Sequence, residues 1–147
     1  MQNLVSKKEE EERRLKALAE YRILGTKPES CYDDITKIAA TTCNVPISLM
    51  TLVDKDKQWF KSKIGLQISE TRRDWSFCTH AIKENSPLII HDAFQDERFI
   101  NNPLVTGDPK IRFYAGFPLR NSDGNKLGTL CVIDRKPGNL TTQQFNI

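Results

Sequence analysis

The sequence lacks any apolar run long enough to cross a membrane. A transmembrane helix needs about 20 consecutive, mainly apolar residues, and charged or polar residues interrupt every apolar run here well before that length. The first residues are polar and charged, whereas a secretory signal has an apolar core after a basic start. These absences argue against membrane insertion, and we expect a cytoplasmic protein.

Charge of one sign is not concentrated in any part of the chain. The 22 Lys and Arg residues and the 19 Asp and Glu residues leave a formal net charge of +3. A nucleic-acid-binding protein usually presents a basic stripe, and the nearest candidate is a short group of lysines. This group contains Lys55, Lys57, Lys61 and Lys63. We expect these lysines to lie on the solvated face of a β-hairpin, so we predict no nucleic-acid partner.

Common catalytic and metal-binding motifs are also missing. The cysteines form no C-x-x-C pair, and the sequence has no glycine-rich phosphate loop, nucleophile elbow or metalloprotease helix. The four cysteines are Cys31, Cys43, Cys78 and Cys131. Because they are far apart, we expect reduced and mostly buried thiols. We therefore predict no catalytic residues and no metal site, and the residues identify no cofactor.

Residues 75–82 are the segment around which we expect the chain to be organised. Ser76 can cap a short helix by accepting a hydrogen bond from a free backbone N–H group. Phe77 and Ala81 are four residues apart and give that helix an apolar face. Residues 88–91 then have the apolar character of a strand. We expect the short helix to cover a sheet and to form one wall of a pocket.

Two longer helices are expected upstream of this segment. Residues 4–24 form an amphipathic pattern whose first half is almost wholly charged. We therefore assign residues 1–12 to a projecting helical segment and residues 13–147 to a single domain. Gly25 suits the end of the first helix because glycine adopts the left-handed conformation without strain. A capping box at residues 26–29 opens the second helix. The face of the second helix that we expect to pack on a sheet contains Tyr32, Ile35, Ile38, Ala39 and Cys43.

The remaining apolar segments predict strands that are joined by hairpins. Strands are expected at residues 47–53, 58–63, 111–119 and 127–133. Hairpins rather than regular βαβ units imply an α+β fold around a mainly antiparallel sheet. The segment from residue 92 to about residue 110 is irregular but contains apolar residues, so we expect a folded lid. Thr141 and Gln144 form a capping box for a last helix, and we expect this helix to be truncated at residue 147.

The order of several short motifs resembles that of GAF domains. The motifs are Ile35-Thr36 through Ala39-Ala40, Pro46-Ile47-Ser48-Leu49, Gln58-Trp59-Phe60-Lys61-Ser62, Ser76-Phe77-Cys78 with His80-Ala81-Ile82, Asn102-Pro103-Leu104-Val105, Arg112-Phe113-Tyr114-Ala115-Gly116 and Leu127-Gly128-Thr129-Leu130-Cys131-Val132-Ile133-Asp134. The resemblance covers about residues 13–146. More narrowly, it is to the subgroup that is common near the N-termini of bacterial sensor histidine kinases and diguanylate cyclases. It implies a central antiparallel sheet of five or six strands. The N- and C-terminal helices would lie on one face, with short helices and a lid loop over a pocket on the other.

The resemblance also implies a function. GAF domains are regulatory modules that bind cyclic nucleotides, bilins, haem or other small molecules, or that only dimerise. We therefore expect a sensor module, without catalytic activity of its own, that controls an attached histidine kinase or diguanylate cyclase. The alternatives are a ligand-free dimerisation module and, more distantly, a free methionine sulfoxide reductase on the same fold. Gly25 departs from this subgroup, which usually has Asp before Thr26.

The residues that would line the pocket combine aromatic and polar side chains. They are Trp59, Trp75, Phe77, Cys78, His80, Asp92, Phe99, Tyr114 and Cys131. Mixed aromatic walls with a few polar groups suit a small organic ligand, although the same aromatic residues can fill an ordinary core. A homodimer through the terminal helices would instead use an apolar seam of Leu15, Leu18 and Ala19.

Cys78 is the residue with the most distinct chemical alternatives. A thiol near a helix N-terminus has a lowered pKa, so Cys78 is a candidate redox sensor as well as a buried structural thiol. Bilin-binding relatives attach the chromophore through a Cys that is usually followed by His, whereas Thr79 follows Cys78 here. A reductase would need a resolving thiol such as Cys131 nearby in space, and the setting departs from the pattern of that enzyme.

Overall fold

A six-stranded antiparallel sheet forms the centre of the computed structural model, which describes residues 6–146. The strands are β1 (Ile47–Val53), β2 (Lys57–Ile64), β3 (Glu70–Arg72), β4 (Leu88–Ile90), β5 (Phe113–Arg120) and β6 (Lys126–Asp134). They are arranged in the order β3-β2-β1-β6-β5-β4, and every neighbouring pair is antiparallel. The expected α+β fold with an antiparallel sheet of five or six strands is confirmed.

Strands β1 and β6 form the middle of the sheet. Every residue of β1 is buried, as its apolar character on both faces predicts. Gly128 on β6 pairs with Leu52 on β1. A Cβ atom at position 128 would lie 1.8 Å from the carbonyl oxygen of Thr51. The close approach of these two strands therefore requires glycine at this position.

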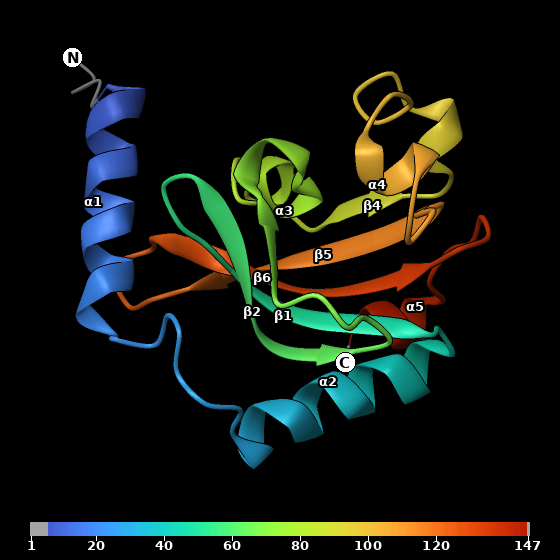
Figure 1. The fold of residues 1–147 in the computed structure, drawn as a ribbon, viewed down its shortest axis with the longest axis horizontal. Coiled ribbons are helices and arrows are strands. Elements are labelled where there is room, and N and C mark those ends of the chain that lie inside the picture. The colour runs from blue at the N-terminus through green and yellow to red at the C-terminus, as the bar shows by residue number, and fades with distance from the viewer. Residues whose placement is uncertain (1–5, 147) are drawn as a thin grey trace.

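Helices cover both faces and one end of the sheet (Figure 1). The helices are α1 (Lys7–Glu20), α2 (Ser30–Cys43), α3 (Phe77–Ala81), α4 (Pro103–Thr106) and α5 (Thr142–Phe145), together with the short 3-10 helices η1 (Arg73–Trp75) and η2 (Ala93–Gln95). Helices α2 and α5 lie on one face of the sheet, and α3 and α4 lie on the other (Figure 1). Helix α1 stands beside one end of the sheet (Figure 1). The short helices η2 and α4 belong to the expected lid, which is folded.

Helix α1 is shorter than the sequence predicted. It ends at Glu20 rather than near residue 24. Gly25 has the expected positive φ, 73°, but it lies in the linker and does not end the helix. Residues 1–5, which include the expected start of this helix and part of the expected projecting segment, lie outside the described residues.

Helix α1 also turns a different face toward the domain. Its buried residues are Arg14, Ala17 and Leu18, whereas Leu15 is half-buried and Ala19 is exposed. Arg14 can be buried on this face of the helix because its Nη1 donates to the carbonyl of Val53 at 2.7 Å. The apolar cluster around Leu18 contains Ala17, Leu52, Trp59 and Leu127. Leu18 therefore serves the core of its own domain, and its side chain is not exposed to a second subunit.

The linker before α2 covers the hairpin face that was expected to be solvated. Lys61 is only 2% exposed, and its Nζ donates to Thr26 Oγ1 at 2.7 Å and to the carbonyl of Lys27 at 2.6 Å. Thr26 Oγ1 in turn donates to the carbonyl of Ile23. The N-cap residue of α2, Glu29, makes no side-chain capping bond. The prediction that Lys61 lies on a solvated face was therefore wrong. The predicted capping box at residues 26–29 was also wrong, because the Thr26 hydroxyl bonds within the linker instead of capping α2.

Helix α2 packs on β2 through polar contacts rather than through the expected isoleucines. Thr36 Oγ1 lies 2.7 Å from Ser62 Oγ, and Ser62 Oγ donates to Asp33 Oδ1 at 2.6 Å. Ile35 and Ile38 are 41% and 57% exposed. The small hydroxyl side chains bring the helix close to the strand, so the isoleucines turn outward and the predicted buried face was wrong at these two positions.

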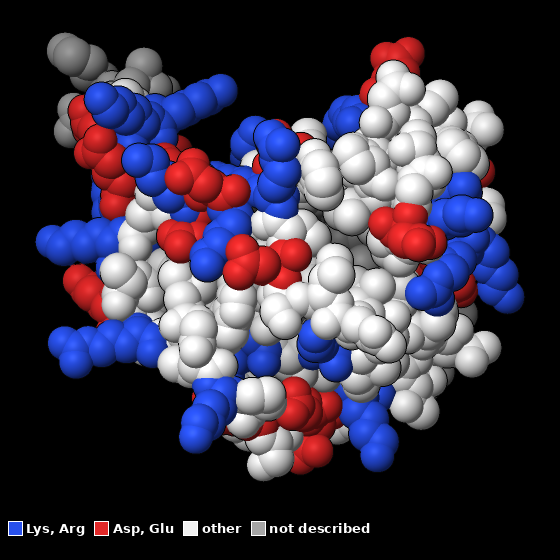
Figure 2. All heavy atoms as spheres, viewed as in Figure 1, with Lys and Arg blue, Asp and Glu red and all other residues white. Residues whose placement is uncertain are grey.

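Basic and acidic side chains are interspersed on the face of the molecule that Figure 2 shows. Many of them belong to α1, at the upper left of this view (Figures 1 and 2). Within residues 6–146, no helix is both long enough and apolar enough to span a membrane.

Candidate functional site

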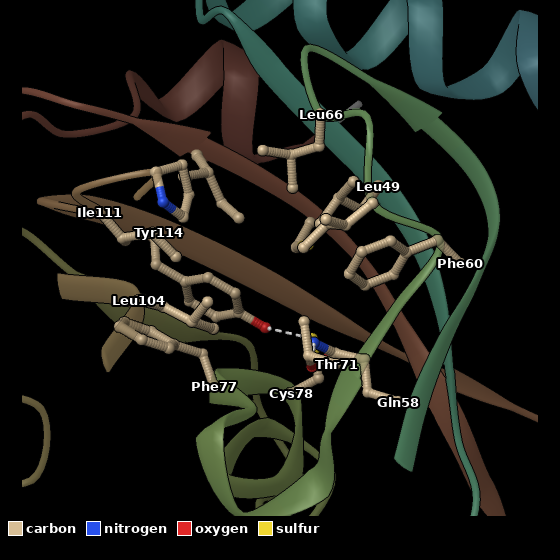
Figure 3. Close-up of a pocket in the computed structure, with 14 residues that line it drawn as sticks. Leu49, Gln58, Phe60, Leu66, Thr71, Phe77, Cys78, Leu104, Ile111 and Tyr114 are labelled. Atoms are coloured by element: carbon tan, nitrogen blue, oxygen red, sulfur yellow. Dashed lines mark hydrogen bonds between the residues drawn. The ribbon is translucent and has the colours of Figure 1, made fainter. Parts of the chain in front are cut away.

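A small cavity lies between α3, the lid and the sheet, where the sequence predicted a pocket (Figure 3). We call it the chamber. It is lined by Leu49, Gln58, Phe60, Leu66, Ile68, Thr71, Phe77, Cys78, Leu104, Pro109, Ile111, Tyr114, Cys131 and Ile133. Its volume is about 20 Å³, which is room for roughly one water molecule. Most of the lining side chains are apolar, and the few polar groups gather near α3 (Figure 3).

Helix α3, the roof of the chamber, is fixed to the sheet by a chain of polar side chains. Ser76 Oγ accepts from the backbone N–H of Thr79 at 3.2 Å, so the predicted cap is confirmed. The same hydroxyl donates to Gln58 Oε1 at 2.7 Å. Gln58 Nε2 then donates to Thr71 Oγ1 at 2.9 Å. The start of α3 is thus anchored to β2 and β3, and the buried side chains of Ser76, Gln58 and Thr71 have hydrogen-bond partners.

Cys78 lies at the centre of a buried cluster of hydroxyl and thiol groups. Tyr114 Oη donates to Cys78 Sγ at 3.2 Å (Figure 3), and Thr129 Oγ1 donates to it at 3.0 Å. Thr51 Oγ1 lies 3.1 Å from Thr129 Oγ1 and extends the cluster to β1. The Tyr114 ring reaches this position because it lies over Gly116, where a Cβ atom would be 2.2 Å from the phenol oxygen.

The cluster shifts the pKa values of the two buried thiols in opposite directions. Burial raises the pKa of Cys78, but hydrogen bonds with the side chains of Cys131, Thr129, Thr51 and Tyr114 lower it, to about 6. Burial and the neighbouring Cys78 raise the pKa of Cys131 well above its ordinary value. Burial also raises the pKa of Tyr114, so the phenol stays a neutral donor. Side-chain hydrogen bonds, first that with Cys131 and then those with the surrounding hydroxyl groups, stabilise the charged form of Cys78.

Four of the nine predicted pocket residues line the chamber, and they are Phe77, Cys78, Tyr114 and Cys131. Two others form an aromatic layer behind it. The Phe99 ring stacks on Phe77 with centroids 4.0 Å apart, and His80 meets Phe99 edge-on at 4.9 Å. Burial is the main cause that lowers the pKa of His80, so this imidazole is neutral near pH 7.

The other three predicted residues lie outside the chamber. Trp59 packs near Leu18 in the cluster beside α1, because alternate residues of β2 face opposite sides of the sheet. Trp75 is half-buried, and its carbonyl accepts from Asn102 Nδ2 at 2.9 Å. Asp92 caps η2 by accepting from the backbone N–H of Phe94. The aromatic and polar composition alone did not distinguish these structural roles from a place in the pocket.

Sequence reasoning missed several residues of the site. Gln58 and Thr71 line the chamber, and Thr129 donates to the Cys78 sulfur. Period-2 alternation places Gln58 on the same face of β2 as Phe60, which was a usable signal. Thr71 gave no signal, because no strand was expected at residues 70–72, where the structure has β3.

A salt-bridge cluster links α1 to the segment that leads into the roof of the chamber. Glu11 pairs with Arg14 on its own helix and with Arg73 in η1. Glu11 belongs to the segment that was expected to project, yet it contacts the domain. Burial by itself would raise the pKa of Glu11, but hydrogen bonds and charge from Arg14 and Arg73 lower it from 4.5 to about 2.

The Glu11 cluster predicts a pH-dependent contribution to stability. A depressed carboxylate pKa stabilises the folded state above pH 4.5, and this contribution is lost as the pH falls toward 2. Because the Glu11 side chain is about a third exposed, solvent screening reduces the effect, and we expect Glu11→Gln to cost about 1 kcal/mol at pH 7. Urea unfolding should show this loss shrinking below pH 4.5. Glu12→Gln, at an exposed neighbour, is the control, and an equal loss there would contradict the assignment.

Comparison with known sequences agrees with the fold. Residues 27–146 match the GAF domain family. The chain is also 40% identical over 129 residues to the cyclic di-GMP phosphodiesterase PA2567 of Pseudomonas aeruginosa. That match covers 88% of this chain and 22% of the relative, so the chain spans about a fifth of the relative's length.

Comparison with solved structures leads to the same family. The GAF domain of a phosphoenolpyruvate-protein phosphotransferase from Coxiella burnetii aligns with a TM-score of 0.65 and 11% identity, covering 96% of this chain and 87% of that chain. A type II free methionine-R-sulfoxide reductase from Thermoplasma acidophilum aligns with a TM-score of 0.63 and 12% identity, covering 86% and 84%. Such low identities show a shared fold alone. The match over residues 27–146 shows that this chain belongs to the GAF domain family.

Proposed function

We propose that this chain is the sensor module of a longer bacterial signalling protein, and that it regulates an output domain which makes or degrades cyclic di-GMP. The sequence suggested a histidine kinase or a diguanylate cyclase as the output. The relative at 40% identity is a cyclic di-GMP phosphodiesterase that extends far beyond the matched region. This relative favours an output domain that acts on cyclic di-GMP. A histidine kinase is the alternative output, because a solved domain of a two-component sensor histidine kinase protein has a similar fold.

The observation that carries the sensor role is the chamber under α3. Apolar side chains form most of its wall, and a few groups that can donate or accept hydrogen bonds gather on one side (Figure 3). Such a site suits a small, largely apolar molecule that carries one polar group. Because the volume is only about 20 Å³, an organic ligand would enter only when the lid moves away from the sheet.

Two side-chain contacts connect the lid to α1 through η1. Asn102, at the start of α4, holds the carbonyl of Trp75 in η1. Arg73, in the same 3-10 helix, pairs with Glu11 on α1. Movement of the lid on ligand binding would therefore pull on η1 and alter the contact with α1. In the full-length protein, helix α1 would carry this change to the neighbouring parts of the chain.

A thermal-shift screen tests ligand binding. Small metabolites that are largely apolar and carry one polar group are the first probes, followed by cyclic AMP, cyclic GMP, haem and biliverdin. A ligand at 100 times its Kd should add about 2.7 kcal/mol to the free energy of unfolding. Leu66 is half-buried at the edge of the chamber, so Leu66→Trp should abolish the shift by blocking the entrance. Ile100→Trp, at an exposed lid position outside the lining, should leave it unchanged. A shift that survives Leu66→Trp would place the ligand elsewhere.

A second copy of the chain is the second candidate partner, and exposed apolar side chains favour a face other than the predicted seam on α1. Ile35, Ile38 and Phe145 are exposed around an apolar groove of about 250 Å³ between α2, α5 and the sheet. Two copies related by a two-fold axis would bring the same helix face together and bury these side chains. We expect Ile38→Glu to give a folded monomer in light scattering, while Ile100→Glu keeps the dimer. An unchanged mass in both variants would remove this face as the interface.

A further inference from the structure

Two buried thiols line the chamber, one on α3 and one on β6, and the proposed binding of a small molecule gives them no chemical role. We infer that Cys78 and Cys131 are a peroxide-sensitive pair that closes to a disulfide across the chamber. This goes beyond the proposed function, because it requires no bound ligand and no output domain.

The two cysteines meet from different layers of the fold. Cys78 lies on α3 and Cys131 on β6, and both line the chamber. Cys78 Sγ accepts from Thr129 Oγ1, which lies two positions before Cys131 on the same strand, and both cysteines belong to one buried cluster. The other two cysteines lie on α2, where Cys31 is exposed and Cys43 is half-buried, and all four are free thiols. The chamber therefore joins two thiols that are 53 positions apart in the sequence.

The hydrogen bonds assign different roles to the two sulfurs. Tyr114 and Thr129 both donate to Cys78 Sγ, so this sulfur acts as an acceptor for two hydroxyl groups. Hydrogen bonds of this kind stabilise a thiolate, which is the nucleophilic form of cysteine. The pKa of Cys78 is correspondingly lowered, while that of Cys131 is raised. Cys78 is therefore the attacking thiolate, and Cys131 is the resolving thiol.

Hydrogen peroxide is the oxidant that fits this site. The surrounding wall is mostly apolar, so a small neutral molecule enters at a lower desolvation cost than a charged oxidant. Leu66, which is half-buried, and Ile68, which is exposed, mark where the lining reaches the surface. Entry is therefore possible beside the loop between β2 and β3, without unfolding of the domain.

The reaction is balanced by one peroxide and two thiols. The Cys78 thiolate attacks one peroxide oxygen, the O–O bond breaks, and the other oxygen leaves as hydroxide and takes a proton to become water. The Cys131 thiol then attacks the sulfenic sulfur of Cys78. An S–S bond forms, the S–O bond breaks, and the hydroxyl leaves as water with the proton from Cys131. The two sulfurs lose two electrons in total, and the peroxide gains them.

The disulfide would change how the chamber is held. Its formation removes the hydrogen bonds that Tyr114 and Thr129 donate to the Cys78 thiolate, and it ties α3 covalently to β6. A cross-link between the roof and the floor would restrict the movement that a ligand needs. Oxidation would thus lock the module in its closed form.

Mass spectrometry of the full chain tests the pair. The protein is treated with hydrogen peroxide, free thiols are blocked, and the peptides are mapped without reduction. We expect a linked peptide that joins Cys78 to Cys131, and we expect it to form before Cys31 is oxidised although Cys31 is exposed. If Cys31 is fully oxidised while Cys78 and Cys131 remain free thiols, the inference is wrong.

Variants separate the roles of the residues. Tyr114→Phe removes one neutral hydrogen bond to the sulfur and should slow formation of the disulfide by about 2- to 10-fold, whereas Tyr32→Phe on α2 should not slow it. Cys131→Ser should leave Cys78 as a sulfenic acid that dimedone traps. Where Cys131→Ser does not fold, the rate of disulfide formation in Tyr114→Phe tests the inference instead. Equal rates for Tyr114→Phe and the unmodified chain would overturn the assigned role of Cys78, whatever the outcome of the ligand screen.

Discussion

Replacing Leu18 with alanine is expected to lower the free energy of unfolding by about 2–5 kcal/mol, the usual cost of emptying a buried leucine site. Leu18 is 1% exposed and packs with the cluster that includes Leu52, Trp59 and Leu127. The cavity left by the alanine would lie between α1 and the sheet. Urea unfolding followed by tryptophan fluorescence is a direct measurement, because Trp59 belongs to the same cluster.

Leu15→Ala is the matched control for Leu18→Ala. Leu15 lies three positions earlier on the same helix but is only half-buried, so less apolar surface is lost and we expect a clearly smaller destabilisation. If the two leucines belonged to a seam between subunits, both variants would lower the mass in light scattering. Equal losses of stability for Leu15 and Leu18 would contradict the packing of α1 described above.

Replacing Gly128 with alanine is expected to destabilise the protein by about 3 kcal/mol or more, at the upper end of the cost of overpacking. The added Cβ would lie 1.8 Å from the Thr51 carbonyl oxygen and 2.8 Å from the Leu52 Cα. These are backbone atoms of the central strand β1, so neither can move without breaking the pairing of β1 with β6. Thermal unfolding and the yield of folded protein are the measurements.

Gly138→Ala is the control for this substitution. A Cβ at Gly138 would lie 3.6 Å from the nearest atom of the Phe113 ring, which is an ordinary contact. We expect a change within about 0.5 kcal/mol, the usual range for a tolerated substitution at a site without strain. A comparable loss at both glycines would contradict the assignment of the cost to the contact between β6 and β1.

The strands and the roof of the chamber were predictable because their signals are local. Residues 47–53 are apolar on both faces, which indicated a central strand, and β1 is fully buried. Ser76 was recognised as a cap from its residue type and position, and its hydroxyl accepts the expected hydrogen bond. Capping and alternation depend on neighbours in the sequence, so a single sequence contains the information.

The buried faces of the first two helices were not predictable in the same way. Thr36 is fully buried against Ser62, while Ile38, two positions further along the helix and on its opposite side, is more than half exposed. Hydropathy patterns count a threonine as polar, although its hydroxyl is satisfied here by a partner 26 residues away in the sequence. Lys61 is buried for a similar reason, since its ammonium group finds oxygen atoms in the linker before α2. Partners that distant become visible only after the chain has folded.

The sequence by itself determined the family, the antiparallel sheet and the segment that covers the chamber, because these follow from motifs and periodicities within short stretches. Only the tertiary structure decided which cysteines meet, which side of α1 is buried and how little space the chamber contains. Those properties depend on side chains from β1, β5, β6 and α3 arriving at one place, as the hydroxyl groups around Cys78 do. The physical reason is that the environment of a buried group is set by its neighbours in space rather than by its neighbours in sequence.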